Sequence, residues 1–515
     1  MEAAGFPCKI ILTGFLLLTC WKYTEWKHRK LCLISYGELM TKAARKSGTR
    51  IKMLLCCGSL VGMAAFLASL NGCGGGSAGS TTPPPPKSKI QHVVIIFQEN
   101  RTPDNLFQDP VLVQRGADIQ SFGINSMGQK ITLTPTSLQT DYDLNHSHTA
   151  FVNMYDNGKM DGADKINGEC NGGGTSCIPP NVWFQYIDPK EAAPYYQIAE
   201  TYTFGDRMFQ TNQGPSFPAH QFIISGTSEP STGSNLFASE NPIRKTGDTY
   251  NPFNFAGCIA PPDERVLLID PTGSESQRIY PCFDHATLTD ELNASAISWR
   301  YYAPSAGIIW NAPNAIQHMC VPNAAPPNGT ACTGPDWVNN VVLNYKRVLS
   351  DIQSGQLATV SWVIPNGLSS DHAGGNDASG PSWVASVVNQ IGNSPYWANT
   401  AIFIAWDDWG GWYDHVAPPI KNSYEYGFRV PLMVVSPYAK AAYVSHTVHH
   451  FGSILKYIEE NFGISSLGFS DADADDLSDC FDYNQTPLTF QTINAPLDAK
   501  HFLDDTSPPT APDND

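Results

Sequence analysis

Short, continuous apolar runs recur along the chain after residue 90, separated by longer stretches rich in Gly, Pro and polar residues. They predict buried strands at 92–97, 221–225, 296–302, 359–364, 400–406 and 431–436. Because the runs are continuous rather than alternating, they favour strands that are covered on both faces. Helical patterns over 382–392 and 451–463 lie among them. Strands and helices in this order predict an α/β fold, a three-layer α/β/α sandwich with a largely parallel central sheet.

The first 88 residues have a different pattern. A positively charged segment starts at Met40, an apolar run covers 54–70, and Leu-Asn-Gly-Cys ends at Cys73. This resembles the lipobox signal of bacterial lipoproteins, in which the chain is cleaved on the N-terminal side of the Cys and the Cys is lipidated. An uncleaved membrane anchor is the alternative, although the run is short for one. We expect a location outside the cytoplasm, either secreted or lipid-anchored in the bacterial cell envelope (periplasm or outer surface).

These patterns divide the chain into five parts. We expect an upstream extension (1–39), a lipoprotein-type signal peptide (40–73), a Gly/Ser/Pro-rich linker (74–88), one large folded domain (89–503) and a polar tail (504–515). Residues 1–72 carry ten Lys and Arg against three Asp and Glu, a net charge of +7, and the rest carries 21 against 45, a net charge of −24. So acidic a domain argues against nonspecific nucleic-acid binding, which needs cationic surface.

Seven cysteines follow Cys73. Six form closely spaced pairs and suggest disulfides across loops, as an oxidising compartment allows: Cys170, Cys177, Cys258, Cys282, Cys320 and Cys332. Spacing leaves their connectivity open, and Cys480 is left over. A zinc site is weakly supported, because no C-x-x-C or clustered Cys/His spacing occurs.

Polar side chains follow the predicted strands at the point where each strand ends. Glu99 and Asn100 follow the first strand, Asp371 and His372 come after 359–364, and Asp407 and Asp408 follow 400–406. Open α/β sheets place their ligand crevice at the carboxyl ends of the strands. Crowded carboxylates repel one another, and a bound divalent cation such as Mg, Ca, Mn or Zn offsets that cost.

The same segments carry a family resemblance that covers most of 90–490. They resemble the bacterial phosphoesterase family, which contains phospholipases C and secreted acid phosphatases and belongs to the alkaline-phosphatase-like superfamily. The matching segments are QENRTPDNLF (98–107), NQGPSFPAHQF (212–222), SSDH (369–372), WDDWGGWYDHVAPP (406–419), YGFRVPLMVVSPYAK (426–440) and the C-terminal DADADDLSDCFDYNQTP.

The resemblance implies a role for particular residues. Glu99 and Asn100, with Asp407 and Asp408, match the metal-binding positions, and Ser216 matches the nucleophile. A helix that starts near Ser216 would help to bind phosphate oxygens. His372 matches a catalytic His near the phosphate, and His318 a phosphate-contacting His in a region of poor similarity. His220 stands where many members have Arg and is a candidate for substrate binding.

Other features have weaker functional interpretations. His146 and His148 are candidates for orienting a loop or contacting the ligand, whereas His415, beside Asp414, fits a structural role. His446, His449 and His450 precede a helix, which favours exposed or capping roles. The acidic run 471–482 resembles a calcium loop but has Asp476 where Gly is needed and Asp482 where Glu is needed.

The sequence therefore predicts a metal-dependent phosphoesterase, acid phosphatase-like, that acts through a phosphoseryl intermediate on a phosphate-ester substrate. A phospholipase C acting on phospholipid head groups is the first alternative. A non-catalytic surface lipoprotein on a hydrolase fold is the second. A sulfatase is disfavoured, because the Cys-x-Pro sequences at Cys177 and Cys320 lack the Arg of the sulfatase motif.

Overall fold

The computed structural model describes residues 12–13, 15–16, 88–243 and 256–510. The chain divides into two units, 1–80 and 81–515. In the first, the described residues are two short antiparallel strands, β1 (Leu12–Thr13) and β2 (Phe15–Leu16). The expected signal peptide, its Cys73 and nearly all of the expected linker lie outside the described residues. The paragraphs that follow concern the second unit.

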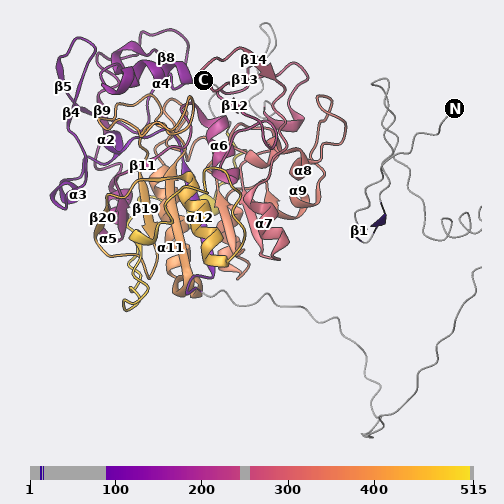
Figure 1. Ribbon diagram of the computed structural model, residues 1–515. Helices are drawn as coiled ribbons and strands as arrows, with labels where there is room; N and C mark the ends of the chain where they lie inside the picture. Colours follow the sequence, from indigo (N-terminus) through magenta and orange to yellow (C-terminus); the bar gives the residue numbers. More distant parts are fainter. Residues whose placement is uncertain (1–11, 14, 17–87, 244–255, 511–515) are drawn as a thin grey trace, which may run out of the picture. The chain divides into compact units, whose positions relative to one another are not determined.

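An eight-stranded sheet, in the order β16-β15-β17-β3-β18-β19-β10-β20, forms the centre of this unit (Figure 1). Its strands are β3 (His92–Gln98), β10 (Thr203–Gly205), β15 (Trp299–Tyr302), β16 (Val341–Val342), β17 (Val360–Val363), β18 (Thr400–Trp406), β19 (Leu432–Val435) and β20 (Tyr443–Ser445). Only β19 runs antiparallel to its neighbours in this sheet. The predicted, largely parallel sheet is therefore confirmed.

Helices cover both faces of the sheet, since all seven residues of the central strand β18 are buried. The long helices pack against one another in two sets. One set is α5 (Ala193–Thr201), α10 (Arg347–Gln353), α11 (Gly380–Gly392) and α13 (Ala499–Asp504), and the other is α6 (Ser216–Ser225), α7 (Leu288–Ala294) and α12 (Phe451–Phe462). The three-layer α/β/α arrangement is confirmed.

Smaller elements lie in the long connections. The strands are β4 (Phe122–Ile124), β5 (Lys130–Thr132), β6 (Thr134–Thr136), β7 (Tyr142–Leu144), β8 (Gly168–Cys170), β9 (Gln185–Ile187), β11 (Met208–Phe209), β12 (Phe237–Ala238), β13 (Val266–Ile269), β14 (Gln277–Ile279) and β21 (His449–His450). The helices are α2 (Pro103–Leu106), α3 (Pro110–Gln114), α4 (His148–Tyr155), α8 (Gln317–Cys320) and α9 (Pro335–Asn340), with six 3₁₀ turns, η1 (Asp156–Gly158), η2 (Ala163–Lys165), η3 (Gly257–Ile259), η4 (Ala312–Ala315), η5 (Pro395–Asn399) and η6 (Ser478–Cys480).

One predicted strand is wrong: residues 221–225 form the second half of helix α6. All ten residues of α6 are buried, so its sequence lacks the polar face that identifies most helices. A short apolar run of this kind is compatible with a buried strand or a buried helix, and hydrophobic periodicity alone does not separate them.

Three disulfides join the paired cysteines in sequence order: Cys170–Cys177, Cys258–Cys282 and Cys320–Cys332. Cys480 is buried and outside any disulfide. The start of the expected polar tail contacts the domain, since Lys346 pairs with Asp505 and the amide of Leu368 donates to Thr510 Oγ1 (2.9 Å).

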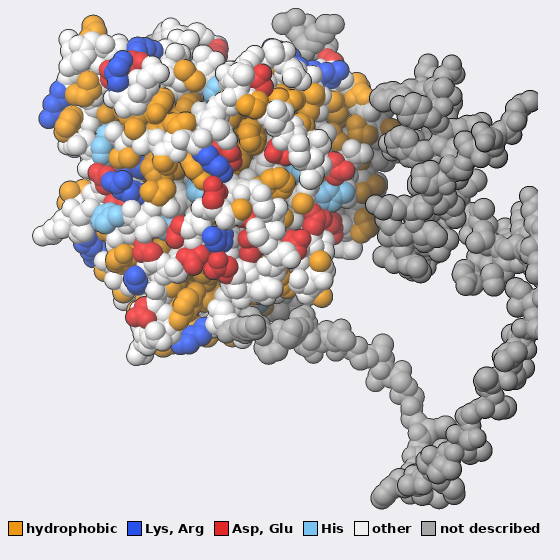
Figure 2. Space-filling view, viewed as in Figure 1, with side chains coloured by type: hydrophobic (Ala, Val, Ile, Leu, Met, Phe, Trp, Pro, Cys, Tyr) orange, Lys and Arg blue, Asp and Glu red, His pale blue; other side chains and the backbone are white. Residues whose placement is uncertain are grey.

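The surface agrees with the acidic composition. Figure 2 shows Asp and Glu side chains gathered in several places on one face of the domain. Among the described residues, no helix combines the length and apolar character that crossing a membrane requires.

Candidate active site

Two acidic segments lie side by side because β3 and β18 are parallel neighbours in register, with Gln98 beside Trp406. Glu99 and Asn100 follow the first strand, and Asp407 and Asp408 follow the second; all four side chains are fully buried. These four residues were expected to meet at the carboxyl edge of the sheet, and the structure brings them together there.

The backbone around Asn100 holds the two segments together. Asn100 adopts a positive φ of 64°, and its amide donates to Asp407 Oδ1 (3.1 Å). Gly410 packs directly on it: a Cβ at this glycine would lie 2.5 Å from Asn100 Cβ and O. Gly410 itself has a φ of +61°, so no other residue type fits this position without strain.

Helix α6 places Ser216 opposite the acidic segments, beginning at that residue as expected. The Ser216 hydroxyl lies 3.5 Å from Glu99 Oε2 and 3.4 Å from Asp408 Oδ2. The preceding turn is tight, because a Cβ on Gly214 would approach Ser239 O to 2.5 Å. Asn212 Nδ2 donates to Gly214 O (2.8 Å) and fixes the turn from within.

His220 lies one turn further along α6 and faces the same carboxylates. Its Nε2 is 3.3 Å from Glu99 Oε1 and 3.8 Å from Asp407 Oδ2. Burial lowers the pKa of His220 to about 4, although Asp407 opposes the shift, so the imidazole is neutral at pH 7. Burial, with the charges of Asp407 and Asp408, raises the pKa of Glu99 well above its usual value. The structure therefore places His220 against the acidic segments; its expected contact with substrate stays a prediction.

His146 orients the Asn100 amide. His146 Nδ1 donates to Leu144 O (2.8 Å), so Nε2 accepts from Asn100 Nδ2 (3.1 Å). That bond turns Asn100 Oδ1 away from His146 and towards the acidic segments. His146 Nε2 is also 3.8 Å from Asp408 Oδ2.

His372 lies beside this group. Its ring centroid is 5.7 Å from that of His146 and 6.0 Å from that of Trp310. Its Nδ1 donates to Ala373 O (2.7 Å), which leaves Nε2 as the nitrogen for contact with other groups. The structure places His372 beside His146, whose Nε2 contacts Asn100 and Asp408.

Asp371 positions the loop that carries His372. Its Oδ2 accepts hydrogen bonds from Tyr195 Oη (2.8 Å) and Trp406 Nε1 (2.9 Å), and its carbonyl accepts from Arg101 Nε (2.9 Å) and Nη2 (2.6 Å). Burial raises the pKa of Asp371 to about 6, while Arg101 opposes the shift. Asp371 is thus an anchor of the loop, held by Tyr195, Trp406 and Arg101.

The acidic group fits a divalent cation. Asn100 Oδ1 and Asp407 Oδ2 are buried, and neither accepts a hydrogen bond from the described residues. Glu99, His220 and Asp407 each offer a ligand atom within 4.8 Å of the others. Buried carboxylates need a nearby positive charge, and oxygen with imidazole ligands suits Mg, Mn or Zn. Six residues of this site are candidates for metal binding and catalysis, and we call them the catalytic cluster: Glu99, Asn100, Ser216, His220, Asp407 and Asp408.

His318 has other partners. Its Nδ1 is 2.7 Å from Asp284 Oδ1 and its Nε2 is 3.2 Å from Asp290 Oδ1, so both ring nitrogens face carboxylates of that region. The hydrogen bonds and charges of Asp290 and Asp284 outweigh burial and raise the pKa of His318 to about 9. A substrate-contacting role for His318 stays a prediction that these contacts do not support.

The remaining histidines have structural contacts. His148 starts α4 and pairs with Glu275 (3.4 Å). His450 caps α12, accepting a bond from the amide of Gly452 at Nδ1, as expected. His449 and His450 are buried rather than exposed, whereas His446 is 54% exposed.

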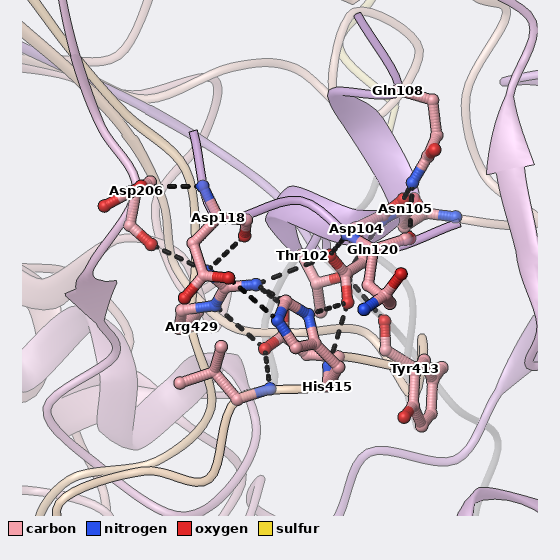
Figure 3. Close-up of polar contacts among 12 residues, drawn as sticks. Thr102, Asp104, Asn105, Gln108, Asp118, Gln120, Asp206, Tyr413, His415 and Arg429 are labelled. Carbon is pink, nitrogen blue, oxygen red and sulfur yellow. Dashed lines mark hydrogen bonds and ion pairs between the residues drawn. The ribbon is translucent and has the colours of Figure 1, made fainter. Parts of the chain in front are cut away.

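A second buried acidic group, drawn in Figure 3, surrounds Arg429. The guanidinium donates from Nε to Asp414 Oδ1 (2.9 Å) and from Nη2 to Asp414 Oδ2 (3.0 Å), and Nη2 lies 3.4 Å from Asp104 Oδ1. His415 bridges Asp104 Oδ2 (2.7 Å) and Asp118 Oδ1 (3.1 Å) (Figure 3). We call Asp104, Asp118, Asp414, His415 and Arg429 the Arg429 network. The partners of His415 are Asp104 and Asp118, which lie outside its own turn, so the bond within the turn that its position beside Asp414 suggested is not what the structure shows.

Fold and site together define an α/β protein with a buried acidic cluster, a candidate metal site, at the carboxyl edge of a largely parallel sheet. The chain belongs to the Phosphoesterase family, whose family model matches residues 90–465.

Curated relatives of this chain are phospholipases C. The hemolytic phospholipase C of Pseudomonas aeruginosa is 22% identical over an alignment of 451 residues, which covers 76% of this chain and 56% of that protein. The non-hemolytic phospholipase C of the same organism is 23% identical over 74% of this chain and 55% of its own length. Phospholipase C B of Mycobacterium tuberculosis is 23% identical, covering 77% of this chain and 78% of that protein. The chain thus spans about half the length of the Pseudomonas relatives.

Solved structures give weaker similarities. A protein of the alkaline phosphatase superfamily from Vibrio parahaemolyticus matches with a TM-score of 0.32 and 10% identity over 76% of this chain and 72% of that one. Ps i-CgsB in complex with k-i-k-neocarrahexaose matches with a TM-score of 0.35 and 9% identity over 75% of each chain.

Proposed function

We propose that this protein hydrolyses phosphate esters at the catalytic cluster, with Ser216 as the nucleophile and a phosphoseryl intermediate. The observation that carries the proposal is the position of the Ser216 hydroxyl, buried at the start of α6 and within 3.5 Å of two carboxylates. Family membership supports phosphoester chemistry in general.

A divalent cation held by Glu99, Asn100, Asp407 and Asp408 would supply positive charge that stabilises the phosphate oxygens and activates the attacking group. The chain's own residues do the rest. Ser216 Oγ attacks phosphorus, and its proton has Glu99 and Asp408 as neighbouring acceptors. His372 is our candidate for protonating the leaving oxygen, because its ring lies next to that of His146, which contacts Asn100 and Asp408. Water then attacks the phosphoserine and releases phosphate.

Helix α6 contributes less to phosphate binding than its N-terminus suggests. The amide of Phe217 donates to Asn241 Oδ1 (2.9 Å), and residue 218 is a proline without an amide hydrogen. The helix therefore offers mainly its dipole at Ser216, while the cluster and the neighbouring histidines have to supply direct contacts.

The test is hydrolysis of an aryl phosphate by Ser216→Ala, with Ser225→Ala at the other end of α6 as the matched control. Both substitutions remove one buried hydroxyl from the same helix. We expect Ser216→Ala to lose at least ~10³-fold in kcat, and Ser225→Ala to keep activity within a few-fold. Near-wild-type turnover by Ser216→Ala would exclude this residue as the nucleophile.

Substrate choice separates the two enzymatic alternatives. We favour a phosphomonoester, acid phosphatase-like activity, whereas the names of the relatives favour phospholipase C. Parallel assays with an aryl phosphate and with phosphatidylcholine vesicles distinguish them by which product, inorganic phosphate or phosphocholine, is released. Absence of both products in metal-supplemented protein would instead favour a non-catalytic surface lipoprotein.

We further propose that the protein is exported and attached to the membrane by lipid on Cys73, an inference supported by the Leu-Asn-Gly-Cys sequence alone. Labelling of a bacterial host with a radioactive fatty acid should mark the wild type and leave Cys73→Ala unlabelled. Equal labelling of the wild type and of Cys73→Ala would contradict lipid attachment at Cys73.

A further inference from the structure

A second group of metal-ligating side chains shares no residue with the catalytic cluster. It forms where the acidic run 471–482 packs on β20 and β21. His449, Asp479 and Cys480 each offer one ligand atom, and the three atoms lie within 4.8 Å of one another. His449 and Cys480 are fully buried, and Asp479 is partly exposed.

His449 is oriented as a metal ligand would be. Its Nδ1 lies 2.5 Å from Asp475 Oδ2, and because a carboxylate only accepts, Nδ1 carries the proton. The lone pair of Nε2 then points at Ser445 Oγ (3.1 Å) and Cys480 Sγ (3.9 Å). A carboxylate on one ring nitrogen and a metal on the other is the usual arrangement of histidine ligands in proteins.

Cys480 presents its sulfur to the same point. Its carbonyl is held by the Lys440 amide (2.9 Å) and the Thr203 hydroxyl (3.1 Å), which fixes the residue in place. A tetrahedral ion with a metal–sulfur bond of about 2.3 Å and a metal–nitrogen bond of about 2.0 Å would separate the two ligand atoms by about 3.5 Å. The observed 3.9 Å is close to that separation and long for a hydrogen bond.

Asp479 completes the group from the exposed side. Its Oδ1 accepts from Tyr443 Oη (3.2 Å), and its Oδ2 contacts the Ser445 hydroxyl. Sulfur, nitrogen and carboxylate oxygen therefore converge from η6 and β21, while Ser445 at the end of β20 borders the fourth side.

We propose that His449 Nε2, Cys480 Sγ and Asp479 form a site for a zinc-class transition metal, with Asp475 as the positioning residue for His449. A thiolate with imidazole selects zinc over magnesium or calcium, in contrast to the oxygen-rich catalytic cluster. The fourth ligand is the Ser445 hydroxyl or a water.

Such an ion would clamp the C-terminal acidic run to the strand that leads to the nucleophile. β21 pairs in parallel with β11, with His449 beside Met208, and β11 precedes the turn and helix that carry Ser216. The role is structural, because two of the three ligands are fully buried.

The experiment uses the full chain in the Asp407→Asn background, in which the catalytic cluster has lost a ligand. The protein is loaded with Co²⁺, dialysed, and examined for bound metal and for the cobalt–thiolate charge-transfer absorption. We expect about one ion per chain and a clear band. Adding Cys480→Ala should abolish the band and the ion, whereas Cys480→Ala alone should keep phosphoesterase activity within about twofold.

Six cysteines precede residue 74, so the thiolate has to be assigned by substitution. If Cys480→Ala does not fold, Cys480→Ser conserves the volume and still removes the thiolate, so loss of the band remains the readout. A band that persists in either variant, or no band and no bound ion in the Asp407→Asn parent, would show that these residues form a hydrogen-bonded cluster only and would overturn the proposal. Neither result depends on the proposed phosphoesterase activity.

Discussion

The domain buries two groups of carboxylates, and they differ in where their positive charge comes from. In the Arg429 network, the fully buried guanidinium contacts Asp414 and Asp104 directly. In the catalytic cluster, Glu99 and Asp407 have no Lys or Arg partner among the described residues, and the nearest cationic candidate, His220, is neutral.

Two buried groups of like composition thus have different functions. Where the chain supplies its own cation, Arg429, the acidic residues have a structural role. They connect helix α2, the loop that follows β18 and the segment that precedes β19. Where it does not, burial and then the repulsion from Asp407 and Asp408 raise the pKa of Glu99, and the buried charges create a demand for an external cation. The unbalanced group is the one to expect at a functional site.

The largest difference should appear when one carboxylate is neutralised in each group. Asp407→Asn should lower kcat/KM for an aryl phosphate by at least ~10³-fold. It should leave the metal-free protein as stable as the wild type or more so, because it relieves repulsion. Asp414→Asn, the matched change in the Arg429 network, should do the reverse, keeping activity in folded protein while lowering the midpoint of urea unfolding. Equal effects on activity would remove the contrast between the groups.

Substitution of Arg429, the internal cation, should cause the largest change in stability. Arg429→Met leaves Asp104 and Asp414 buried without their partner, and should lower the free energy of unfolding by about 3–5 kcal/mol. Arg429→Lys keeps the charge but not the forked geometry, so a smaller loss is expected. Urea titration with both variants measures the difference. If Arg429→Met lowers the free energy of unfolding by less than about 1 kcal/mol, the fold does not depend on the Arg429 network for its stability.

Of the two buried acidic groups, metal removal should affect only the catalytic cluster. At a free metal concentration of about 100 times Kd, binding stabilises the fold by about 2.7 kcal/mol. We expect a chelator to remove this stabilisation in the Cys480→Ala background, chosen so that the second proposed site does not contribute. The Asp407→Asn, Cys480→Ala double variant should show little response. If the two variants respond alike, the cation is bound elsewhere.

The meeting of the four candidate metal ligands could be predicted from the sequence, but the residues that orient them could not. Glu99, Asn100, Asp407 and Asp408 could be predicted because each pair directly follows a strand of continuous apolar residues, and parallel neighbours end at one edge. Asn100's orienting partner, His146, comes from a loop whose approach to the sheet depends on tertiary packing. No local pattern distinguishes it from His148, two residues later, which pairs with Glu275 instead.

The same limit applies to the fold and to the second acidic group. Strands with both faces buried were found, but the run 221–225 was assigned to the wrong element because α6 has no polar face. Arg429 lies 15 residues after Asp414 and 325 after Asp104 along the chain, so its role as their cation could not be derived from spacing. Long-range ion pairs of this kind are set by topology rather than by a motif.

The smallest effect that we predict is on how the free energy of unfolding depends on pH. It distinguishes His415 from His318, a histidine outside the Arg429 network. Burial lowers the pKa of His415, but the hydrogen bond and charge of Asp104, with Asp414, outweigh it and raise that pKa to about 9. Because the folded pKa is above the unfolded value of about 6.5, the stabilisation is fully present below pH 6.5. It is lost as the pH rises through about 9.

Wild-type protein should therefore lose on the order of 1–2 kcal/mol of unfolding free energy between pH 6 and pH 9.5 through His415, after allowance for solvent screening of a partly exposed ring. His415→Gln should lack this part of the decline.

The pKa of His318 is also raised to about 9, but its side chain is 34% exposed and its partners Asp284 and Asp290 are 58% and 36% exposed. His318→Gln should consequently keep a decline close to that of the wild type in the same urea titrations. A His415→Gln profile parallel to the wild type would mean that Arg429 alone offsets the charges of the network and that His415 adds no measurable stability.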